Sequence, residues 1–304
     1  MKKSLKLLCL LLSFILLICS SWQNVVFAAN DVQKDYYITS YDCQEGTITT
    51  NSLLQTIKEA KDSGKILYDA PSLEIASKTK IEINDEQRMV FDDDEWEEVS
   101  PRDARVAYIR TYWKDGSSNT RGTAFFISND TVVTSAHCIY NASRGGWCEY
   151  ADIFPAKNGS TNPYGQISSD TIHLLTSYMS APANDNDYAI IELESAPNVG
   201  YFGWSTSATS GQSIKIMGYP SYLVNDPPSG TSQIIKQYYD TGTINAAYTG
   251  YIRTTNTNTN GGSSGGPVLN SSDKVIAIVK SHTSSANIAT RVDSYAAEWF
   301  SSFR

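Results

Sequence analysis

Short apolar runs separated by polar turn residues dominate the chain from about residue 105 onwards. The runs are rich in β-branched and aromatic residues, and Gly, Asn, Asp and Ser stand between them. Many short strands joined by polar turns are typical of β-sandwiches and β-barrels, and not of a parallel sheet with crossover helices. The pattern therefore predicts an all-β fold. The expected strands are residues 106–109, 123–127, 131–134, 189–193, 213–217, 265–269 and 275–279.

Two segments have helical spacing instead. In residues 293–300 an aspartate can serve as N-cap, and Tyr295 and Trp299 share one helix face. This spacing predicts a C-terminal helix. Residues 53–61 predict a second helix, within a polar segment that shows no strand alternation. We interpret that segment, residues 30–80, as a propeptide.

The N-terminus carries a targeting signal. Residues 1–6 contain three lysines, an apolar run follows over residues 7–19, and Ala28 and Ala29 provide a cleavage site. This order is that of a secretory signal peptide, and the apolar run is too short to span a bilayer comfortably. We predict that residues 1–29 are removed and that the protein is secreted and extracellular; an uncleaved membrane anchor is the alternative. No later stretch has the length and apolarity of a membrane span, which predicts no stable membrane association after signal cleavage.

Composition and charge exclude several classes of protein. With 304 residues, 41% of them hydrophobic, the chain can bury a core, and its net charge is −8. The longest like-charge cluster is acidic, over residues 92–98, so nucleic acid is not an expected partner. We interpret this cluster as a solvated charge run in preference to a calcium site, and we predict no metal and no cofactor. The mature domain is expected to begin just before it and to span residues 81–304.

The five cysteines fall into three groups. Two leave with the signal peptide, and Cys43 lies in the predicted propeptide. Cys138 and Cys148 remain, separated by a short stretch that contains glycine. Because extracellular proteins commonly form disulfides, we predict a Cys138–Cys148 disulfide.

The first of three candidate catalytic motifs contains a histidine. Of the three histidines, only His137 has a suggestive context: it lies in the run Thr-Ser-Ala-His-Cys, residues 134–138, and follows a strand-like segment, residues 131–133. Histidine is the commonest general base at neutral pH, and a strand end can hold its ring rigidly at a cleft. A zinc site has little support, because the sequence has no H-E-x-x-H motif and His173 and His282 lie far from His137 in sequence.

The other two motifs supply an acid and a nucleophile. Asp187 precedes an apolar strand, and a buried carboxylate there can accept the second ring proton of a histidine. Ser264 lies within residues 261–266, where glycines can turn backbone N–H groups toward one point, as an oxyanion hole requires. Asp185 and Ser263 are the alternatives at these two positions.

Together these motifs resemble the chymotrypsin-like serine endopeptidases, and most closely the secreted glutamyl endopeptidases of Gram-positive bacteria. The order His137, Asp187, Ser264 is the chymotrypsin order, whereas an α/β-hydrolase would place its serine first. The resemblance covers about residues 81–304. It implies two antiparallel Greek-key β-barrels with the triad at their junction. The motifs that carry it are residues 135–141, 158–160, 163–165, 187–193, 199–203, 218–220, 261–268 and 290–292.

The resemblance also implies the catalytic roles. Ser264 is the nucleophile, because only this serine fits the family pattern Gly-x-Ser-Gly-(Gly or Ser)-Pro. His137 is the general base and acid, and Asp187 orients it. The backbone N–H groups of Gly262 and Ser264 form the oxyanion hole. Many relatives pair the cysteine after the histidine with an upstream cysteine, but Gly122 stands near that position, so Cys138 either pairs with Cys148 or stays free.

Substrate preference depends on a few further positions. Six residues before the nucleophile the chain has Asn258, where trypsin has Asp, so a preference for Lys or Arg is not expected. Thr259 matches the glutamyl branch, in which a Thr or Ser and a histidine bind the substrate carboxylate. Counting along the strand places Val279 at the histidine position, whereas a small shift would supply His282, and both assignments stay open. The resemblance thus implies Glu or Asp before the scissile bond.

We therefore predict a secreted serine endopeptidase, made as a zymogen. It would act as a monomer on protein or peptide substrates and pass through an acyl-enzyme. The alternative is a catalytically inactive homologue that serves as an extracellular binding module. Such a protein would be expected to have a broken triad or a filled oxyanion loop, and neither is visible in the sequence.

Overall fold

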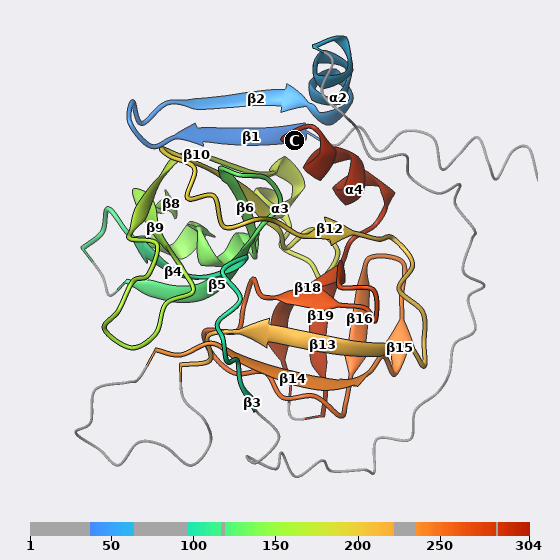
Figure 1. Cartoon of the computed structure of the whole chain (residues 1–304). Helices are drawn as coiled ribbons and strands as arrows, with labels where there is room; N and C mark the ends of the chain where they lie inside the picture. The colour runs from blue at the N-terminus through green and yellow to red at the C-terminus, as the bar shows by residue number, and fades with distance from the viewer. Residues whose placement is uncertain (1–36, 64–96, 117–118, 222–234, 284) are drawn as a thin grey trace, which may run out of the picture. The chain divides into compact units, whose positions relative to one another are not determined.

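The fold is built mainly from β-strands, as predicted from the sequence, and a computed structural model shows how they are arranged (Figure 1). The structure describes residues 37–63, 97–116, 119–221, 235–283 and 285–304. The predicted signal peptide, the expected cleavage points near residues 29 and 80, and most of the 92–98 cluster lie outside the described residues.

One sheet closes into a six-stranded antiparallel barrel. Its hydrogen-bonded order is β11-β6-β5-β4-β9-β10, and β10 pairs with β11 to complete the ring. β10 bends to do this, since residues 167 and 168 pair with β9 and residues 169–174 pair with β11. The strands are β4 (Val106–Tyr112), β5 (Thr120–Phe126), β6 (Thr131–Thr134), β9 (Tyr150–Pro155), β10 (Ile167–Leu175) and β11 (Ala189–Leu193).

The second sheet is a half-barrel. Its strands follow the order β15-β16-β19-β18-β17-β13-β14-β3, and β12 pairs with β18 in parallel. A second apolar core lies on it and includes Ile216, Ile252 and Ile276. The predicted all-β double-barrel class is therefore confirmed. The strands are β3 (Glu97–Glu98), β12 (Gly203–Trp204), β13 (Ser213–Gly218), β14 (Tyr238–Thr243), β15 (Ala246–Ala247), β16 (Tyr251–Thr254), β17 (Pro267–Leu269), β18 (Lys274–His282) and β19 (Asn287–Arg291).

The predicted C-terminal helix is α4 (Ser294–Ser301). Asp293 caps it, because its Oδ1 accepts the N–H of Ala296 at 2.9 Å. Trp299 and Phe300 are fully buried on the face that the apolar spacing indicated. Among the described residues, no helix has the length and apolarity needed to cross a membrane. The remaining short elements are η2 (Ala136–Cys138), β7 (Tyr140–Asn141), η3 (Ala142–Arg144), β8 (Gly146–Trp147) and α3 (Thr176–Ser180).

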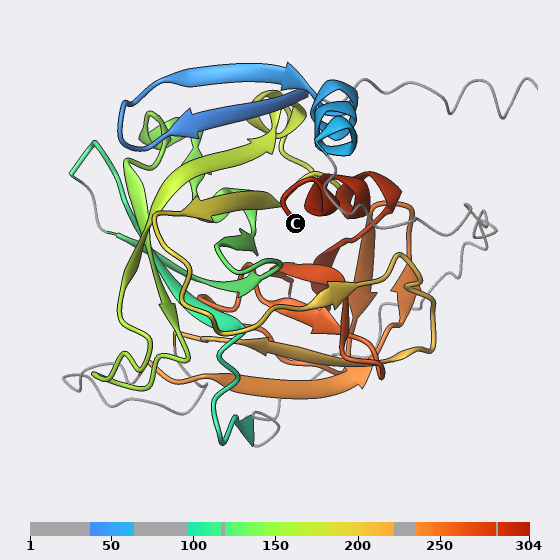
Figure 2. The ribbon, with the colours of Figure 1, turned by 45° about the horizontal axis from the view of Figure 1, so that its top comes forward.

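The N-terminal segment, residues 37–63, is more ordered than its composition indicates. The predicted helix is present as α2 (Leu53–Asp62), but the expectation of no strands was wrong. β1 (Tyr37–Asp42) and β2 (Ile48–Ser52) form an antiparallel hairpin, and β1 pairs with β10 of the closed barrel. Figures 1 and 2 show this hairpin beside β10 and α2 next to α4. The alternation was hidden because Thr39 is buried through hydroxyl hydrogen bonds and not through an apolar side chain.

Candidate active site

His137 lies just after strand β6, in the turn η2. Its backbone N–H donates to Oδ1 of Asp187 at 3.0 Å, and its ring Nδ1 lies 2.9 Å from Oδ2 of the same carboxylate. Because a carboxylate only accepts, the proton of the second hydrogen bond belongs on Nδ1. Nε2 is then the ring nitrogen able to take a proton from a nucleophile.

The pairing of two strands places this acid beside the histidine. Ala189 of β11 pairs with Thr134 of β6, so the chain just before β11 meets the chain just after β6. Asp187 is 1% exposed, as the role of a buried orienting acid requires. Asp185, the alternative acid, is exposed, and its side chain lies next to Gly250. The structure thus brings Asp187, and not Asp185, to His137.

The surroundings of His137 set its proton affinity. Burial disfavours the imidazolium and lowers the pKa of His137, but the neighbouring Cys138 and Asp187 raise it by more. The pKa of His137 consequently lies well above its ordinary value. We infer that the buried carboxylate holds and stabilises the protonated ring, as expected of a general base that must carry a proton between two steps.

Ser264 lies on the turn that leads into β17, and its carbonyl oxygen lies 3.9 Å from Sγ of Cys138, the residue after His137. Its carbonyl accepts the N–H of Thr123 at 2.8 Å, and its Oγ donates to the carbonyl of Lys280 at 3.2 Å. For attack on a substrate, this hydroxyl must turn from that carbonyl toward Nε2 of the histidine. Ser263 is a poor alternative, because it is fully buried and its Oγ accepts the N–H of Asn260 at 3.3 Å.

The turn before Ser264 requires glycine at position 262. Gly262 has φ of +96°, and a Cβ added there would lie 2.4 Å from the carbonyl oxygen of Tyr219, so only glycine fits. The Thr123 hydroxyl donates a hydrogen bond to the Gly262 carbonyl at 2.8 Å and holds that carbonyl in place. Within the described part of the chain, no hydrogen bond uses the N–H of Gly262 or of Ser264. Both donors are available for a developing oxyanion.

Lys280, which the sequence analysis did not single out, lies beside Asp187 and Ser264. Its Nζ lies 3.8 Å from Oδ2 of Asp187, and its carbonyl accepts the Ser264 hydroxyl. Strand pairing explains the placement, because the carbonyl of Val279, the preceding residue, accepts the N–H of Gly265 at 2.8 Å. The sequence feature that could have indicated this contact is the position of Lys280 directly after Val279, at the end of the expected strand 275–279.

Thr259 and His282, the residues expected to bind the substrate side chain, do not contact each other in the described structure. Thr259 Oγ1 donates to Oδ1 of Asn287 at 2.6 Å. Nδ2 of Asn287 donates to the Thr257 carbonyl, and because a carbonyl only accepts, this contact fixes which way the amide faces. Val279 is buried in the second core, whereas His282 is exposed at the end of β18. Asn287 is the partner of Thr259 that the sequence reading did not identify.

The three described cysteines are all free thiols. Cys138 and Cys148 are buried in the core of the closed barrel, and Cys43 packs against the same core. The thiol of Cys138 faces Gly122, since a Cβ added at Gly122 would lie 3.0 Å from its Sγ. Gly122 therefore leaves room for the Cys138 thiol. No disulfide joins Cys138 and Cys148 in the structure, and their pairing stays a prediction.

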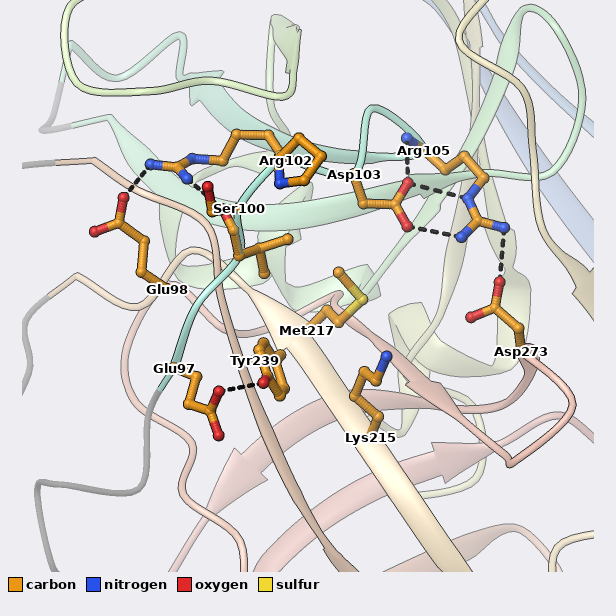
Figure 3. Close-up of a pocket in the computed structure, with 12 residues that line it drawn as sticks. Glu97, Glu98, Ser100, Arg102, Asp103, Arg105, Lys215, Met217, Tyr239 and Asp273 are labelled. Atoms are coloured by element: carbon orange, nitrogen blue, oxygen red, sulfur yellow. Dashed lines mark hydrogen bonds and ion pairs between the residues drawn. The ribbon is translucent and has the colours of Figure 1, made fainter.

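A hollow of about 550 Å³ lies away from the triad, between β3, β13 and β14 (Figure 3). Several of its charges pair with one another: Arg105 bonds Asp103 at 2.7 Å and Asp273 at 2.8 Å, and Arg102 pairs with Glu98. Glu98 also pairs with Lys236, so this end of the acidic cluster is solvated and ion-paired. Across the described ranges, no group of three His, Cys, Asp or Glu residues could hold a metal.

Comparison with known proteins decides the family. A model of the trypsin-like peptidase domain matches residues 122–278, just over half of the chain. The chain belongs to the trypsin-like peptidase family. The matched range contains His137, Asp187 and Ser264.

Two curated relatives of this peptidase come from Bacillus. An extracellular metalloprotease of Bacillus subtilis is 34% identical over 186 residues, which cover 58% of this chain and 56% of that protein. A glutamyl endopeptidase of Bacillus licheniformis is 36% identical over 154 residues, which cover 49% of this chain and 45% of that protein. The chain thus matches about half the length of each.

Solved structures share the fold of the peptidase. A Glu endopeptidase in complex with MPD has a TM-score of 0.59 at 22% identity, covering 67% of this chain and 94% of that chain. The protease Anisep from Arthrobacter nicotinovorans has a TM-score of 0.54 at 21% identity, covering 66% of this chain and 99% of that chain. These likenesses support the double-barrel architecture.

Proposed function

We propose that this trypsin-like peptidase is a serine endopeptidase whose triad is His137, Asp187 and Ser264. The observation that carries the proposal is the pair of hydrogen bonds from His137 to one buried carboxylate, 3.0 and 2.9 Å long, next to the Ser264 turn. This arrangement holds the ring with Nε2 available, which is the requirement for deprotonating a serine.

The proposed reaction has two halves. Ser264 Oγ attacks the scissile carbonyl while Nε2 of His137 takes its proton, and the N–H groups of Gly262 and Ser264 stabilise the oxyanion. His137 then protonates the leaving amine, and an acyl-enzyme ester remains on Ser264. Water attacks the ester, His137 accepts a proton from that water and returns it to Ser264 Oγ, and the acid product leaves.

We also propose a preference for Glu or Asp before the scissile bond. It is supported by Thr259, which matches the glutamyl branch, and by the likeness to the glutamyl endopeptidase of Bacillus licheniformis. A substrate carboxylate would take the Thr259 hydroxyl hydrogen bond from Asn287, which holds it in the structure at 2.6 Å. Engagement of His282 would require the exposed end of β18 to move toward the substrate.

The proposal also covers export and maturation of the chain. The signal-like N-terminus supports export, and the polar segment before residue 81 supports synthesis as a zymogen. The mature enzyme is proposed to act outside the cell as a monomer, on protein or peptide substrates. An intact N-terminal sequence on the exported protein would contradict the maturation step, and mass spectrometry of the secreted chain reads it directly.

A digest of a diverse peptide library tests the reaction and the preference together. The wild-type enzyme is expected to cleave chiefly after Glu and Asp, and Ser264→Ala is expected to lose cleavage by several orders of magnitude. Cleavage chiefly after Leu, Phe or Ala would refute the preference and leave the triad standing. Equal cleavage by both proteins would refute the triad, and no cleavage by either would favour an inactive binding module.

A further inference from the structure

The N-terminal segment, residues 37–63, is built into the closed barrel. β1 pairs with β10 in a continuous antiparallel register from Ile38 opposite Leu175 to Asp42 opposite Thr171. The N–H of Cys43 then donates to the carbonyl of Asp170 at 2.8 Å and extends the ladder by one step. Backbone hydrogen bonds from the N-terminal segment therefore occupy the edge of β10 over residues 170–175.

The side chains of β1 complete the core of the barrel. Tyr41 is 2% exposed and stacks on Trp147 with ring centroids 5.6 Å apart. On the same strand, Thr39 Oγ1 bonds Thr176 Oγ1 at 2.7 Å. Since Tyr41 belongs to the same apolar cluster as the strands of the barrel, its removal would leave a space in that core.

Two further polar contacts join the hairpin to β10. Ser40 Oγ lies 2.7 Å from Nδ1 of His173, and Sγ of Cys43 lies 3.3 Å from Oγ of Ser169. Burial raises the pKa of Cys43 to about 11, so its thiol is neutral where it packs against the barrel. Both contacts are lost if the hairpin leaves.

Helix α2 adds a second attachment. Leu53, Ile57 and Ala60 are 2%, 5% and 6% exposed and repeat at helical spacing along one face. α2 packs next to α4, the C-terminal helix (Figure 2). The segment thus holds the barrel at two places, through β1 at the sheet edge and through α2 at the C-terminal helix.

The segment does not occupy the active site. Among the described residues, none of its hydrogen bonds reaches His137, Asp187 or Ser264, and the His137 side chain is 36% exposed. The described part of the segment therefore leaves the His137 side chain partly exposed. Loss of the segment would open residues 171–175 of β10 as an unpaired strand edge and uncover Trp147 and the part of α4 that α2 contacts, which favours aggregation.

We propose that residues 37–63 stay bound after maturation, as a separate chain that forms part of the active enzyme. The proposal rests on the zymogen maturation proposed above, with the chain cut between residues 63 and 97. The partner of the exposed β10 edge is then this chain's own N-terminal segment, held as an added strand pair. The mature enzyme consists of two associated pieces.

The test uses the full chain with Ser264→Ala, so that it does not depend on the enzyme's own activity. A recognition sequence for a site-specific protease is inserted between residues 63 and 97, and the cut protein is passed over a size-exclusion column. The N-terminal piece is expected to co-elute with the barrels, and the amides of residues 38–42 are expected to stay protected from hydrogen exchange. Elution of the piece by itself, or exchange of these amides as fast as in an unfolded peptide, overturns the proposal.

Two tyrosines on β1 supply a matched pair of variants. Tyr41→Ala removes a buried ring and is expected to speed release of the cut piece on the order of a hundredfold. Tyr37 is 50% exposed, and Tyr37→Ala is expected to change the release rate by less than about threefold. Equal rates for the two variants would contradict attachment through the buried face. If Tyr41→Ala does not fold, the exchange measurement on the parent protein decides the question alone.

Discussion

The orienting carboxylate offers a sharp test of the catalytic geometry, through Asp187→Asn. Oδ1 and Oδ2 of Asp187 each accept one hydrogen bond, from the N–H and from Nδ1 of His137. An asparagine keeps only one acceptor oxygen, so its amide N–H₂ must face one of these two donors. The ring then favours the tautomer with its proton on Nε2, which cannot take the serine proton.

The expected loss is large because the carboxylate is 1% exposed and water cannot replace it. The rate constant kcat should fall about 10⁴-fold, equivalent to about 5 kcal/mol of transition-state stabilisation. Asp187 also raises the pKa of His137, so its removal lowers that pKa. Since the base must be neutral, kcat/KM in the wild type falls as the pH drops through this raised pKa. In the variant, that acid limb should move to lower pH.

The assay is the initial rate of peptide hydrolysis from about pH 4 to pH 10 for the wild type, Asp187→Asn and Asp185→Asn. Asp185 is exposed two residues away, so its variant controls for the loss of a nearby charge. It is expected to retain activity within about threefold. A loss smaller than about tenfold in Asp187→Asn, or an equal loss in both variants, would refute the assigned role.

Three further substitutions have expected outcomes. Lys280→Met removes the ammonium group 3.8 Å from the carboxylate of Asp187, so the protonated form of His137 gains stability. The acid limb of kcat/KM should therefore move to higher pH by up to about one pH unit, and an unchanged limb would show that Lys280 does not affect the pKa of His137. Gly262→Ala should lower kcat by about 10²- to 10³-fold, because its Cβ meets backbone 2.4 Å away, whereas Gly261→Ala has open space and should lose little. Trp299→Ala should lower the free energy of unfolding in urea by about 3 to 5 kcal/mol, against under about 0.5 kcal/mol for the exposed Tyr164→Ala; similar losses would contradict the buried packing of α4.

Local motifs were enough to select the candidate site residues. His137, Asp187 and Ser264 each adjoin a short apolar strand, and the order of the three along the chain indicated the double-barrel class. The choice of Asp187 over Asp185 required only that the acid lie next to β11, and the pairing of β11 with β6 confirms that placement. The C-terminal helix was predictable for the same reason, because its cap and apolar spacing are both local.

Features that depend on strand register were not predictable. Lys280 reaches Asp187 because β18 pairs with the Ser264 turn, and Thr259 meets Asn287 across a separation of 28 residues. The β18–β19 pairing is irregular between Val279 and Ser281, and His282 lies beyond that irregularity. A residue count along one strand cannot show which side chain such an irregularity turns outward.

The β1–β2 hairpin of the N-terminal segment was not predicted, for a different physical reason. Thr39 is buried by its hydroxyl contacts and Ser40 is positioned by His173, so neither contributes to an apolar pattern. β2 faces solvent along most of its length and has no apolar alternation at all. Its pairing depends on the neighbouring strand, which a reading of local periodicity does not include.

Covalent labelling shows whether Ser264 is a nucleophile that His137 activates. The matured protein is incubated with a fluorophosphonate probe, and the labelled residue is identified by mass spectrometry. The account predicts one label per chain, on Ser264, which is lost in Ser264→Ala and strongly reduced in Asp187→Asn. Ser263→Ala is expected to keep the label. Label on another residue, or no label on a protein shown to be folded, would contradict the account.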